Sequence, residues 1–130
     1  MLADHHCLAT IATADLDRAR AFYEQTLGFK PTRQVPEVGV VAYEAGNGSV
    51  LLYASEFAST NKATALSFDV PTDAFDAEIT ALRQAGVDFE TYDLPGTTWE
   101  DGVARMGGQR AAWFKDPDGN ILSLTAGMIV

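Results

Sequence analysis

The sequence is poor in cysteine, histidine and basic residues. Cys7 is the only cysteine among 130 residues, so no disulfide can form within one chain, and we expect a reducing compartment, the cytoplasm. His5 and His6 are the only histidines. Nine basic residues against 18 acidic ones give a net charge of −9, which repels the phosphates of nucleic acids and anionic lipids. We therefore expect neither a nucleic acid nor a membrane as partner.

Long apolar runs are also missing. No run approaches the roughly 20 residues that a membrane-spanning helix needs. The segment 1–10 has no basic lead and no long apolar core, so it does not resemble a secretion signal. Hydrophobic residues nevertheless make up 47% of the chain, which suffices for the core of one domain. We expect a single domain over residues 1–130.

One pattern of elements occurs twice. Asp15 and Gly28 mark the start and end of a first helix, and Asp73 and Gly86 mark a second helix with the same separation. Each helix is preceded by one strand-like run and followed by three. The expected strands are 7–12, 29–33, 38–44 and 49–54 in the first half and 64–69, 87–92, 109–115 and 121–125 in the second. The chain is therefore an internal duplication.

Two such βαβββ modules, about 1–58 and 59–130, predict an α+β fold. Neither half could bury its sheet and helix alone. Side by side they form a curved eight-stranded mixed sheet with the helices on its outer face, and the hollow side is a natural pocket. The segment 93–108 has no counterpart in the first half. Its glycines and proline predict a long loop of the kind that often acts as a lid.

Two stretches, DLDRARAFYEQTLGF (15–29) and WFKDPDGNILSL (113–124), carry a family resemblance. The chain resembles the vicinal oxygen chelate superfamily, which includes glyoxalases, bleomycin-resistance proteins and ring-cleaving dioxygenases. The shared residues are those of hairpins, caps and core, including a tight turn at 116–120, so they indicate the fold rather than the chemistry. Members commonly form dimers, and the resemblance implies a homodimer to which the apolar tail 125–130 could contribute.

In the metal-using members of that superfamily, four His, Gln or Glu ligands lie on the inner faces of four strands. The resemblance places these four positions at Leu8, Leu52, Ala63 and Ser123. None of these side chains is a competent ligand for a divalent cation. We therefore expect no metal, no other cofactor and an apolar centre of the cavity.

Other side chains are expected to contact a ligand in the hollow. Thr10 and Ala65 are small and on inward faces, which leaves room for a ligand. Trp99 and Met106 lie on the long loop, where a tryptophan is rarely exposed without a contact. Trp113 and Phe114 alternate along one strand. The family pattern favours Trp113 facing inward, but large aromatic residues also fill cores, and the direction of Trp113 stays open.

His6, Glu44 and Asp69 are the candidates for acid–base catalysis. Each also has an ordinary explanation, because terminal histidines fray and carboxylates at strand ends are commonly solvated. Cys7 is expected to pack beneath a helix. Three functions remain open. The first is metal-free binding of a small apolar or aromatic molecule, and the second is a metal-free isomerase or lyase. The third, a metal-dependent lactoylglutathione lyase or dioxygenase, requires a different register at several positions.

Overall fold

A single mixed sheet dominates the computed structural model, which describes residues 1–26, 28–115 and 121–128. Within these residues nine strands follow the order β2-β3-β4-β1-β5-β9-β8-β7-β6. The strands of the first half are β1 (His6–Thr13), β2 (Lys30–Val35), β3 (Val40–Ala45) and β4 (Gly48–Ala54). Those of the second half are β5 (Thr64–Val70), β6 (Thr98–Glu100), β7 (Val103–Met106), β8 (Gln109–Lys115) and β9 (Ile121–Ala126).

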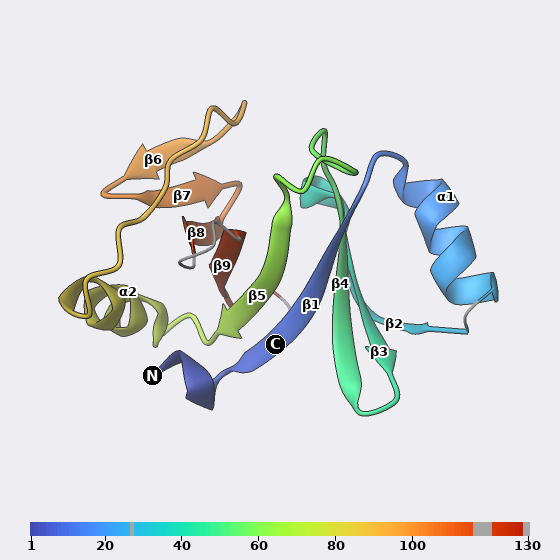
Figure 1. Cartoon of the computed structure of the whole chain (residues 1–130), viewed down its shortest axis with the longest axis horizontal. Helices are drawn as coiled ribbons and strands as arrows, with labels where there is room; N and C mark the ends of the chain where they lie inside the picture. Colours follow the sequence, from blue (N-terminus) through green and yellow to red (C-terminus); the bar gives the residue numbers. More distant parts are fainter. Residues whose placement is uncertain (27, 116–120, 129–130) are drawn as a thin grey trace.

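The two halves of the chain meet at the centre of the sheet. β1 and β5 are antiparallel neighbours, with His6 opposite Asp69 and Ala9 opposite Leu66. β1 is parallel to β4, and β5 is parallel to β9. Figure 1 shows these central strands side by side, with the two helices at opposite ends of the sheet. The predicted α+β fold with a mixed sheet and outer helices is confirmed.

The first helix covers the outer face of the first half. α1 (Leu16–Ala21) begins after Asp15, whose carboxylate accepts a hydrogen bond of 3.1 Å from the backbone N–H of Arg18, as expected for a cap. It continues into a π turn, η2 (Phe22–Thr26). Ala19 and Tyr23 pack against a buried cluster of Val41, Tyr43 and Leu52.

The second helix covers the outer face of the second half. α2 (Phe75–Gln84) starts later than Asp73, and its N-cap residue, Ala74, makes no side-chain capping bond. Phe75 and Ile79 are buried against Val70 of β5 and Leu124 of β9. Two 3₁₀ turns, η1 (Leu2–Asp4) and η3 (Pro36–Val38), complete the helical segments described. None of the described helices is long and apolar enough to cross a bilayer.

The second half differs from prediction between α2 and β8. The strand expected at 87–92 does not form, and only Glu90 makes an isolated bridge, to Trp113. Val87 and Phe89 instead pack against the α2 cluster. The expected loop 93–108 contains β6 and β7, which brings the number of described strands to nine rather than eight.

Two further expectations at the surface have different outcomes. Cys7 is exposed, so its predicted place beneath a helix is wrong. Figure 1 shows α1 and α2 at the two flanks. The outer face of β1 meets α1 only in its C-terminal part, at Ile11, and is exposed at Cys7 and Ala9. The tight turn predicted at 116–120 lies outside the described residues.

Candidate functional site

A cavity of about 330 Å³ lies on the inner face of the sheet, opposite the helices. Its walls are mainly apolar side chains at alternate positions of neighbouring strands, as the period of a strand requires. Those from the sheet include Val40, Leu51, Tyr53, Ala111, Trp113 and Ile121. Met106 of β7 and Leu94, which precedes β6, also line it.

The floor of the cavity carries three hydroxyl groups in a chain. Thr10 of β1, Ser67 of β5 and Ser123 of β9 are 8%, 3% and 3% exposed. The Oγ of Ser67 lies 2.9 Å from Oγ1 of Thr10 and 2.9 Å from Oγ of Ser123. Thr10 Oγ1 also lies 3.0 Å from the backbone carbonyl oxygen of Leu8. The three hydroxyls therefore bridge both halves of the molecule at the central strands.

Trp113 forms an aromatic wall, and the structure settles the direction that the sequence left open. Its side chain lines the cavity, and its Nε1–H donates a hydrogen bond of 3.2 Å to Thr64 Oγ1. The next residue, Phe114, packs on the opposite face in the α2 cluster. Trp99 of β6 contacts the Trp113 ring at a centroid distance of 5.9 Å. Trp99, which does not line the cavity, therefore supports the indole ring of Trp113.

Tyr92 is a site residue that the sequence did not suggest. It lines the cavity and meets the Trp113 ring edge-on at 5.9 Å. Its hydroxyl oxygen is buried and has no hydrogen-bond partner among the described residues. Burial raises the pKa of Tyr92, and the nearby charge of Glu90 adds to the increase. The hydroxyl is therefore protonated at neutral pH.

Most of the sequence-predicted ligand residues lie at the cavity, but their binding role stays a prediction. Thr10, Ala63, Met106, Trp113 and Ser123 line it. Trp99 does not line the cavity; its ring packs against that of Trp113.

Leu8 is on the inner face but lies below the cavity. It is 1% exposed and packs in a cluster with Leu51 and Met128. Met128 is itself 5% exposed and lines the cavity. The described part of the C-terminal tail is therefore turned inward at Met128, and that side chain is not available for the dimer contact suggested from sequence.

The placement of Leu52 on the inner face is wrong. Leu52 packs beneath α1 on the outer face, and its neighbours Leu51 and Tyr53 line the cavity instead. The prediction counted four residues from Gly48 as from Gly119. Gly48 is part of β4, opposite Ala45, and further along β4 Leu51 and Tyr53 line the cavity. The count is therefore off by one residue in β4, and a shift of one residue reverses the face.

The inward placement of Ala65 is also wrong. Ala65 is exposed and absent from the cavity lining, which includes Ala63 and Thr64. The pairing of β5 with β9 shifts between Thr64 and Leu66. This bulge adds one residue to β5, so alternation counted back from Ser67 fails at Ala65.

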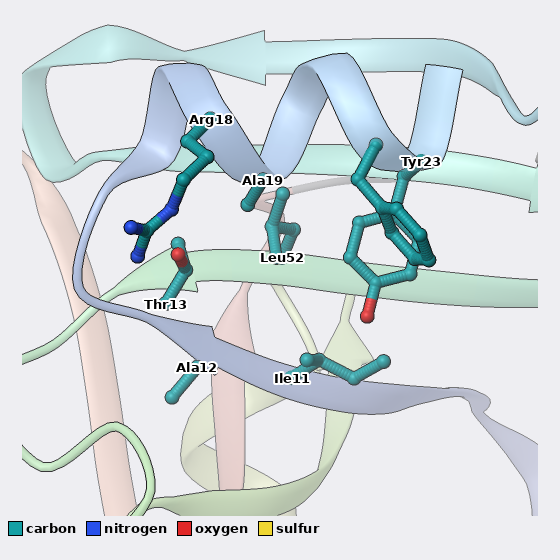
Figure 2. A pocket seen from close by; sticks show the side chains of 8 residues that line it. Ile11, Ala12, Thr13, Arg18, Ala19, Tyr23 and Leu52 are labelled. Atoms are coloured by element: carbon teal, nitrogen blue, oxygen red, sulfur yellow. The ribbon is translucent and has the colours of Figure 1, made fainter. Parts of the chain in front are cut away.

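A second cavity, of about 350 Å³, lies on the outer face between α1 and the sheet. Figure 2 shows Arg18, Ala19 and Tyr23 pointing from the helical segment toward Thr13, Leu52 and Ile11 of the strands. This groove is the seam between a short helix and the sheet on which it packs. It shares no lining residue with the inner cavity.

The three candidates for acid–base catalysis do not line the inner cavity. His6 is exposed, and its Nε2 contacts Ser49 Oγ at 3.0 Å. Glu44 is exposed on β3 opposite Lys30. Asp69 is buried, and one carboxylate oxygen accepts hydrogen bonds from Thr125 Oγ1 at 2.6 Å and from the Met128 backbone N–H at 2.9 Å. Asp69 thus anchors the C-terminal tail.

The donor set of the inner face does not fit a divalent metal. Within the described residues, no three His, Cys, Asp or Glu side chains are grouped so that they could hold one ion. The polar atoms at the floor are neutral hydroxyls of Thr10, Ser67 and Ser123, which are already hydrogen-bonded to one another. Such hydroxyls do not replace the imidazole and carboxylate ligands that these metals need.

Solved structures share the fold over nearly their whole length. A NAD-dependent benzaldehyde dehydrogenase from Legionella pneumophila has a TM-score of 0.64 at 18% identity and covers 92% of this chain and 97% of its own. A methylmalonyl-CoA epimerase from Mycobacterium tuberculosis has a TM-score of 0.55 at 20% identity, with coverage of 91% and 84%. A glyoxalase/bleomycin resistance protein/dioxygenase superfamily member from Vibrio splendidus 12B01 has a TM-score of 0.53 at 12% identity, with coverage of 94% and 98%.

These identities establish a common fold and nothing about chemistry. No curated protein matches the chain. The family model described as Glyoxalase/Bleomycin resistance protein/Dioxygenase superfamily matches residues 5–124. Together with the mixed sheet and its outer helices, this match shows that the chain belongs to the glyoxalase/bleomycin resistance protein/dioxygenase superfamily.

Proposed function

We propose that this protein binds a small apolar or aromatic organic molecule in the inner cavity, without a metal. The observation that carries the proposal is the chemistry of the cavity. Leu51, Tyr53, Met106 and Trp113 supply apolar walls around about 330 Å³, and pockets of this size with few polar groups are typical small-molecule sites. The hydroxyls of the floor, Thr10, Ser67 and Ser123, supply the polar contacts that orient a ligand.

The indole of Trp113 supports a flat ligand. Its N–H donates a hydrogen bond to Thr64 Oγ1, and the rings of Trp99 and Tyr92 pack against the indole. The ring is therefore held in a fixed orientation before a ligand arrives, which reduces the entropy lost on binding. Offset stacking of a second aromatic ring would then contribute about 1 kcal/mol beyond area burial.

Neither alternative is favoured by an observation at the site. A metal-free isomerase or lyase needs an acid or base that reaches the substrate, and His6, Glu44 and Asp69 lie outside the cavity lining. A metal-dependent lactoylglutathione lyase or dioxygenase needs a convergent set of ligands, and the described residues contain no such group. Homodimerisation stays a prediction from the resemblance.

The proposal is tested by calorimetric titration with naphthalene, using one blocking variant and one matched control. Met106→Trp enlarges a side chain that lines the cavity, and we expect it to weaken naphthalene binding at least about tenfold through steric exclusion. Arg105→Trp changes the neighbouring residue of β7, which is exposed and does not line the cavity, and should leave the affinity unchanged.

Two results would overturn the proposal. One is the absence of naphthalene binding to the wild-type protein. The other is stoichiometric divalent metal that survives dialysis and raises the thermal midpoint, because metal retained by the native state stabilises it.

A further inference from the structure

The hydroxyl chain on the cavity floor has one arrangement of protons that satisfies all its contacts. Each of Thr10, Ser67 and Ser123 has one hydroxyl proton to donate. The carbonyl oxygen of Leu8, 3.0 Å from Thr10 Oγ1, can only accept, so the Thr10 proton points to it. The contact of 2.9 Å between Thr10 and Ser67 must then use the Ser67 proton. The contact of 2.9 Å between Ser67 and Ser123 in turn uses the Ser123 proton.

This ordering fixes the chemical character of the floor. All three protons are directed along the chain toward Leu8, away from the open end at Ser123. Ser123 is 3% exposed and lines the cavity, and what its oxygen still offers is lone pairs. Because a buried polar group without a partner is costly, a ligand at this point has to donate a hydrogen bond rather than accept one.

We propose that the ligand of the inner cavity is an aromatic molecule with a hydrogen-bond donor, a phenol or an aryl amine, that donates to Ser123 Oγ. The inference rests on the proposed function, because it assumes that the cavity binds an aromatic molecule. It goes further by assigning the polarity that the ligand must have at its inner end. The ring then lies among the apolar walls, within reach of the Trp113 indole.

Three probes of similar shape test this assignment in calorimetric titrations. Naphthalene has no polar group, 2-naphthol has a donor, and 2-methoxynaphthalene has only an acceptor at the same position. We expect wild-type protein to bind 2-naphthol about tenfold more tightly than 2-methoxynaphthalene, the size of one satisfied hydrogen bond. Ser123→Ala should remove that tenfold advantage, because the acceptor oxygen is lost.

Variants away from the contact atom test the direction of the protons. Ser67→Ala removes the acceptor to which Ser123 donates, so the Ser123 proton is freed for the cavity. 2-Methoxynaphthalene should then gain affinity, and the ratio between the two polar probes should fall toward one. Thr10→Val should have the same effect, since Ser67 loses its acceptor and turns its proton to Ser123. The matched variant Thr10→Ser keeps the hydroxyl and should keep the tenfold ratio.

The outcomes separate this inference from the proposed function. If none of the three probes binds, both are overturned. If naphthalene binds but the wild-type protein does not prefer 2-naphthol, or if the preference survives Ser67→Ala and Thr10→Val, the inference is overturned and the proposed function stands. Naphthalene affinity in each variant also reports whether the cavity is still folded.

Discussion

Tyr43 is the most buried tyrosine described, with 1% of its surface exposed. Its hydroxyl donates a hydrogen bond of 2.9 Å to Glu24 Oε2, and the same carboxylate oxygen accepts from Arg20 Nε at 2.7 Å. Burial disfavours the phenolate and raises the pKa of Tyr43 to about 12, with the hydrogen bond to Glu24 as the second cause. This single residue therefore links η2 to β3 under α1.

Tyr43→Phe should lower the free energy of unfolding by about 1.5–3 kcal/mol at neutral pH, because a hydrogen bond to a charged acceptor is lost. The folded pKa is raised above the unfolded value of about 10, so this stabilisation is complete below pH 10. It is lost as the pH rises through the folded value of about 12. The gap between wild type and variant should thus shrink above about pH 10. Urea denaturation at several pH values measures it, and a constant gap would contradict the assignment.

Residue by residue, alternation along strands predicted much of the inner face and failed where the backbone is irregular. Thr10 and Ser123 lie on the inner face, as expected, and Trp113, whose direction the sequence left open, also faces the cavity. The prediction for Leu52 failed because the count along β4 was off by one residue, and that for Ala65 failed because of the bulge in β5. Both irregularities depend on how one strand pairs with another, which composition does not record.

At the scale of elements, the hairpin of β6 and β7 is the main difference from prediction. Asp101 and Gly102 connect the two strands with φ angles of +49° and +77°, the signs of a tight type I′ hairpin turn. An Asp-Gly pair between two short runs is a recognised signal for such a turn, which the predicted loop 93–108 leaves out. Val87 and Phe89 are apolar at alternate positions, which predicted a strand at 87–92. In the structure both side chains pack against the α2 cluster, and the segment does not join the sheet as a strand.

Gly102→Ala should destabilise the protein by more than the same change at Gly107, which has a φ of +53° in the next turn. Both changes incur the left-handed backbone cost of about 1–2 kcal/mol. Only at Gly102 would the new Cβ also come within 3.1 Å of Phe89 Cβ, whereas at Gly107 nothing lies within 4 Å. Urea midpoints followed by tryptophan fluorescence compare the two variants. Equal losses of unfolding free energy in the two variants would show that Phe89 moves away from the new Cβ without an energetic cost.

At the scale of the whole molecule, the duplication predicted the architecture because each half needs the other to complete the sheet. It could not predict the course of the tail, which has no counterpart in the first half. Asp69 holds the Met128 N–H, and Met128 covers Leu8 on the inner face. These are contacts between residues about 60 to 120 positions apart, which local patterns do not encode.

The continuous sheet should make the two halves unfold together. Trp99 and Trp113, the only tryptophans, both lie in the second half. Leu52 is 1% exposed in the first half, and Leu52→Ala should cost about 2–5 kcal/mol. We expect the tryptophan transition in urea to shift by the same amount as the far-ultraviolet circular dichroism transition. A fluorescence midpoint that does not move would show that the second half unfolds independently.

The central position of β1 also bears on how the chain is made. One edge of β1 pairs with β4 and the other with β5. Because synthesis proceeds from the N-terminus, residues 48–54 become available to β1 before residues 64–70 do. A nascent chain therefore passes through a stage in which the edge at His6–Ala9, with the thiol of Cys7, has no partner strand, and such an edge can recruit strands from neighbouring chains. When the complete chain refolds, β4 and β5 are both present from the start, so β1 need not pass through a stage with one unpaired edge.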